Sequence, residues 1–170
     1  MKEKAVTGTP NYMKQLNKQI ILKYICDEQP VSRSQIAEHT NISRATVSQA
    51  IDELIGEGWV SECGVGSASE HGGRKPIQLT FNANAAYVLS IDVGGTNTVL
   101  ALCNLRGEIK RVLTLPSTEE GVPPLETLNT NIRTLLASLT AEEQNILGIG
   151  IGTPGVTDYL SGVVVDAPSL

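Results

Sequence analysis

Apolar residues in the first third of the chain repeat with helical spacing and predict three helices. The first spans Asn11–Asp27 and ends before Pro30, because proline disfavours helical conformation in the residue that precedes it. The second is short and spans Arg33–His39. The third begins after Ser43 and ends at the glycine-containing segment 56–58, which suits a helix C-terminus. Two short helices thus follow a longer one.

Capping residues and apolar faces support these helices. Serine is a preferred N-cap residue, and Ser32 and Ser43 stand directly before the second and third helices. Between them, Asn41 suits a turn that needs the left-handed conformation, and Ile42 is expected to be buried. The residues expected on apolar helix faces are Leu16, Ile20, Ile21 and Ile25 in the first helix, Ile36 and Ala37 in the second, and Val47, Ile51, Leu54 and Ile55 in the third.

Two short strands joined by a glycine- and serine-rich loop are expected after the third helix. Trp59–Cys63 and Pro76–Phe81 have the composition of strands, and Gly64–Gly73 is expected to form the hairpin loop between them. Three helices followed by a two-stranded wing form the winged helix-turn-helix plan of many DNA-binding domains. We therefore expect a first domain over residues 11–82.

The second half of the chain has the pattern of a sheet with a helix packed on it. Tyr87–Ile91, Thr98–Leu105 and Ile109–Leu115 are predicted strands that tight turns join into an antiparallel meander. Pro123–Leu139 has apolar residues at helical spacing, and Ile146–Ile151 is an apolar strand. This order of elements predicts α/β packing.

Charge is divided unevenly between the two parts of the chain. The net charge is −5, which argues against a protein that coats nucleic acid through bulk charge. Residues 1–82 have nine Lys and Arg and nine Asp and Glu, whereas residues 83–170 have four and nine, so the net charges are 0 and −5. A neutral first domain can still bind DNA if its basic residues share one face.

The cysteines and the short apolar runs indicate a cytoplasmic protein. Cys26, Cys63 and Cys103 are far apart and odd in number, as expected for free thiols in a reducing cytosol and not for a disulfide frame or a zinc site. No apolar stretch approaches the roughly 20 residues that span a bilayer. The first ten residues lack the apolar core of a secretory signal. We therefore expect no metal site and no contact with a membrane.

The start of the third helix has the side chains of a DNA-reading helix. Recognition helices enter the major groove with N-terminal residues that are short, polar and able to form hydrogen bonds. Arg44 can pair with guanine and Gln49 with adenine, and Ser43 and Thr46 suit phosphate contacts. A helical hairpin with a solvated polar face is the alternative, but the serine caps, the short turn and the wing favour DNA binding.

The segment Gly72–Pro76, at the far side of the wing, offers a second basic patch. Its glycines allow the backbone to approach DNA closely, and Arg74 and Lys75 can contact phosphates or the minor groove. An interdomain hinge with solvated charges explains the same residues, and one segment can serve both purposes. Arg33, at the start of the second helix, is also expected to contact DNA. The residues expected to bind DNA are therefore Arg33, Ser43, Arg44, Thr46, Ser48, Gln49, Gly73, Arg74 and Lys75.

The segment Asp92–Thr96 is a candidate for binding phosphate. Glycines at a turn between strands expose backbone N–H groups, so Gly94 and Gly95 can hold an anion with the Thr96 hydroxyl beside them. Asp92 at the end of the strand can hold Mg²⁺ through water. The same pattern also occurs where an Asp-Gly turn only closes a hairpin, so the segment alone is a weak indication.

The segment Gly150–Gly155 matches the GxGxxG pattern of dinucleotide-binding turns and follows a predicted strand. A dinucleotide site requires a helix directly after the glycines. The residues that follow predict a hairpin around Asp158–Gly162 instead. We therefore reject a dinucleotide site.

Taken in this order, the segments resemble the ROK family, whose name stands for repressors, open reading frames and kinases. The closer resemblance is to its xylose-repressor-like and N-acetylglucosamine-repressor-like transcriptional regulators. It implies a winged helix-turn-helix over residues 11–82, followed over residues 83–170 by the N-terminal part of an actin-like ATPase (ribonuclease-H-like) domain, an architecture of the α+β and α/β classes. The five segments that carry the resemblance are Ser32–Ala37, Ser43–Ser48, Gly72–Pro76, Asp92–Thr96 and Gly152–Gly155.

The resemblance also implies a function and partners. Regulators of this branch typically control carbohydrate-utilisation genes, bind palindromic double-stranded operators as dimers or tetramers, and respond to a sugar or sugar phosphate. In the kinases of the family, the Asp-x-Gly-Gly-Thr turn contacts the phosphates of ATP. Because that turn is intact here, the resemblance leaves binding of ATP with Mg²⁺ as an alternative. Pro154 and Gly155 would lie at the edge of the sugar pocket.

The chain ends before the segments that the family uses for catalysis. In family members the catalytic aspartate, the main sugar-binding residues and a cysteine-rich zinc motif follow the Pro-Gly turn, and Ser169 stands where many members have Asn. We therefore expect a truncated chain that is not an enzyme. Three hypotheses remain: a regulator with a partial sugar-sensing domain, an ATP-dependent sugar kinase with an accessory DNA-binding domain, and a bare operator-binding module.

Overall fold

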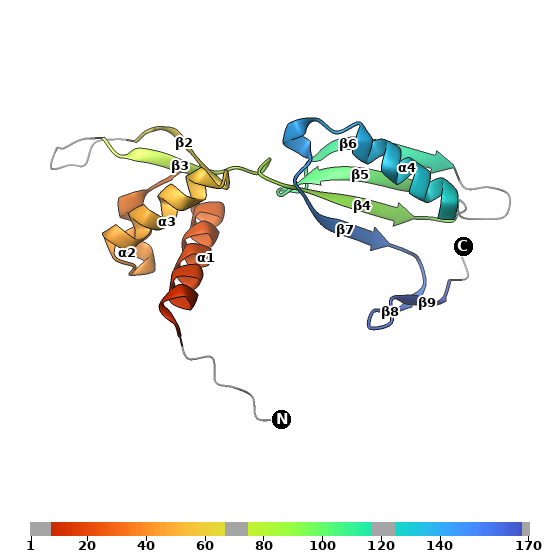
Figure 1. The fold of residues 1–170 in the computed structure, drawn as a ribbon, viewed down its shortest axis with the longest axis horizontal. Helices are drawn as coiled ribbons and strands as arrows, with labels where there is room; N and C mark the ends of the chain where they lie inside the picture. The colour runs from red at the N-terminus through yellow and green to blue at the C-terminus, as the bar shows by residue number, and fades with distance from the viewer. Residues whose placement is uncertain (1–7, 67–74, 117–124, 168–170) are drawn as a thin grey trace, which may run out of the picture. The chain divides into compact units, whose positions relative to one another are not determined.

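The chain divides into two compact units, Met1–Asn82 and Ala83–Leu170 (Figure 1). The computed structural model describes residues 8–66, 75–116 and 125–167. Three helices and three short strands make up the described part of the first unit, and a larger sheet with one long helix makes up most of the second.

The structure confirms the three predicted helices of the first unit. They are α1 (Pro10–Glu28), α2 (Arg33–Thr40) and α3 (Arg44–Gly56). Both predicted serine caps are present, because the Ser32 hydroxyl accepts a hydrogen bond from the backbone N–H of Gln35 at 3.4 Å, and the Ser43 hydroxyl accepts one from Thr46 at 3.2 Å. Asn41 ends α2 in the left-handed conformation with φ 55°, as expected for the turn.

The sheet of the first unit has three strands and not the two that were expected. Across the sheet the antiparallel strands are β1 (Val31–Ser32), β3 (Ile77–Phe81) and β2 (Val60–Val65). In β1, Val31 pairs with Leu79 and Ser32 with Gln78. The sequence pattern does not predict β1, because two residues between two helices are too few to show an alternation of apolar and polar positions.

β2 extends further than the sequence predicts. Its predicted end was Cys63, but the strand continues to Val65 through an irregularity in register between Glu62 and Gly64. A bulge of this kind inserts an extra residue without ending the ladder. Gly64 and Val65 therefore belong to the wing strand and not to the predicted loop, most of which lies outside the described residues.

Side chains from every helix and strand of the first unit form one core. Leu16 and Ile42 are half-buried, and Ile42 packs against this core, although it was expected to be buried. Ile20 is 41% exposed, so its predicted place on the buried face is wrong. It precedes Ile21 by about 100° around the helix axis, and that rotation turns it away from the core. The core residues are Ile21, Ile25, Val31, Ile36, Ala37, Val47, Ala50, Ile51, Leu54, Val60 and Leu79.

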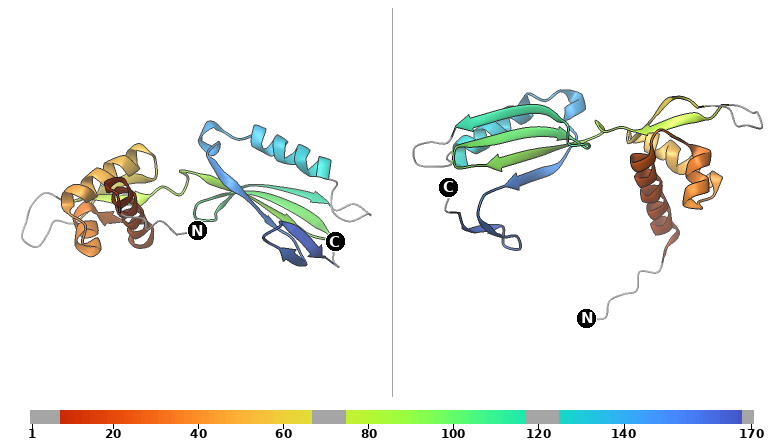
Figure 2. Two further views of the ribbon diagram at one scale, coloured as in Figure 1. Left: turned by 60° about the horizontal axis from the view of Figure 1, so that its bottom comes forward. Right: turned by 180° about the vertical axis from the view of Figure 1, so that it is seen from behind.

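The second unit is a four-stranded mixed sheet with a helix on one face (Figure 2). Across the sheet the strands are β6 (Ile109–Pro116), β5 (Asn97–Asn104), β4 (Tyr87–Val93) and β7 (Ile146–Gly152). β4, β5 and β6 form the predicted antiparallel meander, and β7 pairs with β4 in parallel. The helix, α4 (Leu125–Ala137), ends two residues before its predicted end. It contributes Leu135 to a core with Leu89, Ile91, Leu100 and Leu115.

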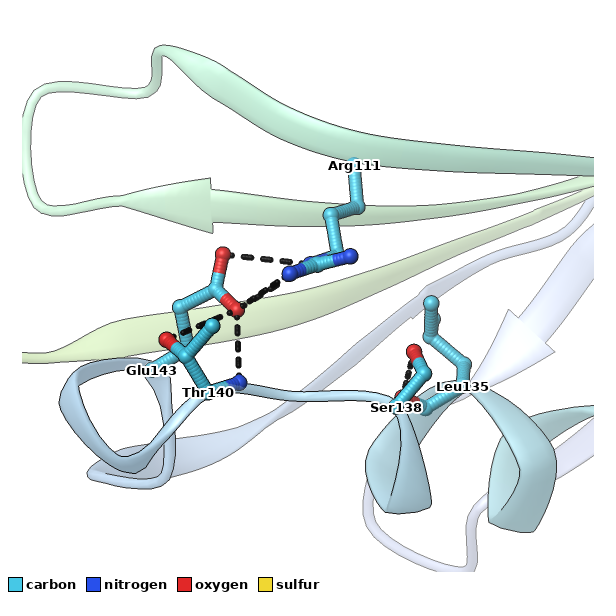
Figure 3. Close-up of polar contacts among 5 residues, drawn as sticks. All are labelled: Arg111, Leu135, Ser138, Thr140 and Glu143. Carbon is cyan, nitrogen blue, oxygen red and sulfur yellow. Dashed lines mark hydrogen bonds and ion pairs between the residues drawn. The ribbon is translucent and has the colours of Figure 1, made fainter.

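A partly buried ion pair ties β6 to the segment after α4 (Figure 3). Arg111 donates to both carboxylate oxygens of Glu143, with its Nη2 at 2.7 Å from Oε2 and its Nε at 3.1 Å from each oxygen. Glu143 closes a short 3-10 helix, Ala141–Glu143, and also accepts the backbone N–H of Thr140 at 2.9 Å. These hydrogen bonds, first of all those from Arg111, lower the pKa of Glu143 to about 2.

Candidate nucleic-acid interface

α3 has one face packed into the core and one face open to solvent. Val47, Ala50, Ile51 and Leu54 are buried, at the spacing of one helix face. On the opposite face Arg44, Ala45, Gln49 and Asp52 are exposed, and Ser48 is half-buried. This open face is called the solvent-facing stripe of α3. Three of the predicted DNA-binding residues, Arg44, Ser48 and Gln49, lie along it, and a fourth, Ser43, caps the helix directly before it.

The N-terminus of α3 favours negative charge. The first backbone N–H groups of a helix and its dipole attract anions. No acidic residue stands in the first turn of α3. Ser43 caps the turn through the Thr46 N–H, and the Ser43 and Thr46 hydroxyls lie 2.9 Å apart. Arg44, the first residue of α3, is exposed and adds a full positive charge at this end.

A groove of about 400 Å³ lies between the start of α3, the start of α2 and the wing. It brings together four residues that sequence reasoning assigned to DNA binding: Arg33, Arg44, Ser48 and Lys75. Gly73 and Arg74, predicted to bind DNA beside Lys75, lie outside the described residues. The complete lining consists of Ser32, Arg33, Ser34, Arg44, Ser48, Lys75, Pro76 and Ile77.

Two cations of the groove have no acidic partner among the described residues. The described part of the first unit contains six Lys and Arg residues, and four of them form ion pairs. The side chains of Arg44 and Lys75 form no hydrogen bond or ion pair with any described residue. The pairs are Lys14 with Glu53, Lys18 with Glu53 and Glu57, Lys23 with Asp27, and Arg33 with Asp52 and Glu62.

Two further predicted contacts have other partners in the structure. The Arg33 guanidinium lies 2.8 Å from Asp52 and 3.6 Å from Glu62. The Gln49 amide donates a long hydrogen bond of 3.4 Å to Glu53. Gln49 is exposed on the stripe of α3 and does not line the groove, so it has solvent access that Arg33 has only in part.

Sequence reasoning missed two residues of this surface. Ser34 lines the groove and also a second hollow of about 580 Å³, which it shares with Ser43 and Arg44. Ala45 is exposed on the stripe of α3, where an apolar methyl group suits contact with the methyl group of thymine. The signal for both was their position: Ser34 stands two residues after a helix cap, and Ala45 directly follows Arg44.

The phosphate-binding candidate of the second unit forms the predicted turn between β4 and β5. The Gly94 N–H donates to the Asn97 carbonyl at 2.9 Å, and a Cβ on Gly94 would lie only 2.9 Å from that same oxygen, so the turn needs glycine there. Asp92, Gly95 and Thr96 are exposed. No group of three or more His, Cys, Asp and Glu that could hold a metal ion occurs among the described residues.

The turn lies beside the second glycine-rich segment. Asp92 of β4 is in register with Gly152 of β7, which leads into Pro154 and Gly155. Gly155 has a φ of 101° and is followed by strand β8 (Val156–Asp158), which pairs with β9 (Val163–Asp166). A strand after the glycines confirms that this segment is not a dinucleotide-binding turn.

Comparison with known families assigns both units. Residues 16–61 match the family described as winged helix-turn-helix DNA-binding, and residues 88–170 match the ROK family. The first unit is therefore a winged helix-turn-helix domain. The second unit belongs to the ROK family. None of the helices in the described ranges is both long and apolar enough to cross a membrane.

Curated relatives and a solved structure support this assignment. The chain is 38% identical over 165 residues to a putative xylose repressor of Caldicellulosiruptor sp. (96% of this chain, 41% of the relative) and 35% identical over 150 residues to the xylose repressor of Bacillus subtilis (86% and 38%). It is 25% identical over 167 residues to the Escherichia coli dual regulator NagC (98% and 41%). A crystal structure of a ROK family transcriptional regulator, a homologue of the E. coli MLC protein, has a TM-score of 0.65 at 24% identity (92% and 40%).

The chain thus spans about two fifths of the length of the curated relatives that it matches. The similarity extends over nearly all of this chain, from the winged helix-turn-helix into the second unit. The likeness to the solved structure supports the fold of the two units, a winged helix-turn-helix followed by a ROK segment.

Proposed function

We propose that this protein is a sequence-specific DNA-binding transcriptional regulator that represses carbohydrate-utilisation genes. The observation that carries the proposal is the groove beside α3, where the side chains of Arg44 and Lys75 present positive charge that no described residue pairs. A neutral domain gains a DNA-binding face when its only uncompensated described cations lie together. Relatives named xylose repressor and N-acetylglucosamine repressor support the kind of gene that is controlled.

The proposed mode of binding places α3 in the major groove. Arg44 would contact guanine, Gln49 adenine, and Ala45 a thymine methyl group. The hydroxyls of Ser43 and Thr46 and the ammonium of Lys75 would contact phosphates, with Gly73 and Arg74 beside Lys75. Ser48, which lines the groove, would lie against the same strand of DNA. Phosphate contacts position the domain, and the base contacts of α3 supply its preference for a sequence.

The partners of the complete protein follow from the same proposal. Its DNA-binding partner is a double-stranded operator, and its effector is a sugar or sugar phosphate held by the ROK domain, with Pro154 and Gly155 at the edge of the pocket. We expect a homodimer or tetramer in the cytoplasm and no catalytic activity. Xylose and N-acetylglucosamine are the first effectors to test, because they appear in the names of the relatives.

A second candidate function is an ATP-dependent sugar kinase with an accessory DNA-binding domain. The turn Asp92–Thr96 favours it, because its exposed Gly95 and Thr96 are suited to phosphate and Asp92 is suited to Mg²⁺ through water. The family assignment includes kinases, whereas the named relatives are repressors and regulators. Turnover of ATP with a panel of sugars tests this candidate, and Asp92→Asn abolishes any such activity if the turn is responsible.

The regulator proposal is tested by titrating the protein into labelled DNA from its own upstream region, with unrelated DNA as the competitor. Arg44→Ala is expected to weaken binding to the upstream DNA by about 1–3 kcal/mol and to relax the preference for it. Lys23→Ala is the matched control, because Lys23 lies on α1 and its charge is compensated by Asp27 at 2.8 Å. Equal, weak and salt-sensitive binding of both DNAs by the wild type would contradict the proposal.

A further inference from the structure

Arg33 connects three structural elements of the winged helix-turn-helix. It is the first residue of α2, its Nη2 lies 2.8 Å from Asp52 Oδ1 on α3, and its Nη1 lies 3.6 Å from Glu62 Oε1 on β2. The planar guanidinium has several donors in a fixed arrangement, so one side chain can hold two carboxylates at once. No other cation among the described residues of this unit contacts both α3 and the wing.

The charge balance around Arg33 opposes a direct contact with DNA. One positive charge faces two carboxylates, and the side chains of Asp52 and Glu62 are 68% and 48% exposed, whereas that of Arg33 is only 29% exposed. A phosphate that approached Arg33 would therefore meet a local excess of negative charge. Arg44 and Lys75, in the same groove, have no such acidic partner among the described residues.

The contacts of Arg33 also fix the shape of the groove. Its walls come from the start of α2, from α3 and from the wing, and these are the elements that Arg33 joins. We propose that Arg33 is a positioning residue, which holds the recognition helix and the wing strand at the spacing that DNA requires and does not itself bind phosphate. This inference rests on the proposed function, and it replaces the expectation that Arg33 contacts DNA.

The dependence of DNA affinity on salt distinguishes the two roles. DNA affinity falls as salt rises, and each phosphate contact adds about 0.9 to the steepness of this fall, which is the absolute slope of log K against log salt concentration. Below, slope means this absolute value. Lys75→Ala is therefore expected to reduce the slope by about 0.9. Arg33→Ala is expected to weaken binding to upstream DNA roughly threefold to tenfold, the effect of losing a partly screened ion-pair network, with the slope unchanged. Lys23→Ala should change neither quantity.

Neutralising the two carboxylates gives an opposite signature. The double variant Asp52→Asn, Glu62→Gln frees the Arg33 charge, so we expect the slope to increase by up to about 0.9 while the preference for upstream over unrelated DNA falls. Arg33→Lys keeps the charge but not the planar fork, so it is expected to retain the wild-type slope and recover only part of the affinity. Arg33→Lys also keeps the test valid if Arg33→Ala does not fold.

A measurement without DNA separates this inference from the proposed function. Hydrogen exchange of the free protein should become faster in β2 and in the second half of α3 when Arg33 is replaced by Ala. In the control Lys23→Ala, exchange in β2 and α3 should stay unchanged. A fall of about 0.9 in the slope for Arg33→Ala, or unchanged affinity and unchanged exchange, would overturn the positioning role. If the wild type binds no upstream DNA, the proposed function fails, and the exchange result alone decides the role of Arg33.

Discussion

The cap of the recognition helix allows stability and DNA binding to be changed in opposite directions. Ser43 accepts a hydrogen bond from the Thr46 N–H at 3.2 Å and stands at an exposed helix end that is proposed to face phosphates. Ser43→Ala removes the cap, whereas Ser43→Asp keeps it, because aspartate caps helices about as well as serine. The two variants therefore separate the structural role of residue 43 from its role at the DNA.

The structure gives the size of each effect. Loss of the cap in Ser43→Ala should reduce the free energy of unfolding of the first unit by about 1 kcal/mol. Ser43→Asp should have wild-type stability or gain up to about 1 kcal/mol, since no acidic residue occupies the first turn of α3. Its carboxylate would repel a phosphate about 4 Å away by about 1 to 4 kcal/mol, depending on how much water remains between them.

Both quantities can be measured on the same samples. Trp59 is the only tryptophan of the chain and packs against the core of the first unit, so its fluorescence during urea unfolding reports the stability of that unit. Fluorescence anisotropy with upstream DNA reports the affinity. Thr9→Ala is the matched control, because Thr9 caps α1 through the Tyr12 N–H at 3.3 Å, away from the groove. Wild-type affinity of Ser43→Asp would refute the placement of this helix end at the DNA.

Two further predictions concern the second unit and are measured by thermal unfolding. Glu143→Gln should lower the thermal stability at neutral pH. Because Arg111 depresses the native pKa of Glu143 to about 2, the difference in stability from wild type should shrink as the pH falls from 4.5 toward 2. A difference that is constant with pH would contradict this. Gly155→Ala should destabilise the second unit by about 1–3 kcal/mol, because φ is 101° and a Cβ would clash with the Asp166 carbonyl oxygen. The control Gly148→Ala places its methyl group in open space and should be tolerated. Equal losses of stability in the two variants would contradict this prediction.

Local signals explain how much of the fold was predictable. Ser32 and Ser43 are capping residues, and each is followed by apolar residues at helical spacing. The first residues of α2 and α3 were therefore predicted correctly. The meander of the second unit was predictable because its strands alternate with tight turns such as Gly94–Thr96. Ile20 was misplaced, because four apolar residues within ten positions of α1 cannot all lie on one narrow face.

Contacts between distant parts of the chain explain what was missed. β1 exists only because Val31 and Ser32 pair with β3 almost fifty residues later. The side-chain amide oxygen of Gln29, Oε1, accepts the Phe81 N–H at 2.8 Å, which joins the end of α1 to the same strand. The partners of Arg33 on α3 and β2 likewise follow from tertiary packing, so the sequence alone did not show that two carboxylates lie beside its guanidinium.

The DNA-binding surface can be located directly on the protein. Amide chemical shifts of the ¹⁵N-labelled chain would be followed by NMR during titration with upstream DNA. We expect the largest changes at residues 43–49 and around Lys75–Ile77, with little change along β4–β7 of the second unit. Changes centred on the turn Asp92–Thr96, or no changes around α3, would contradict the assignment of this groove as the DNA-binding surface.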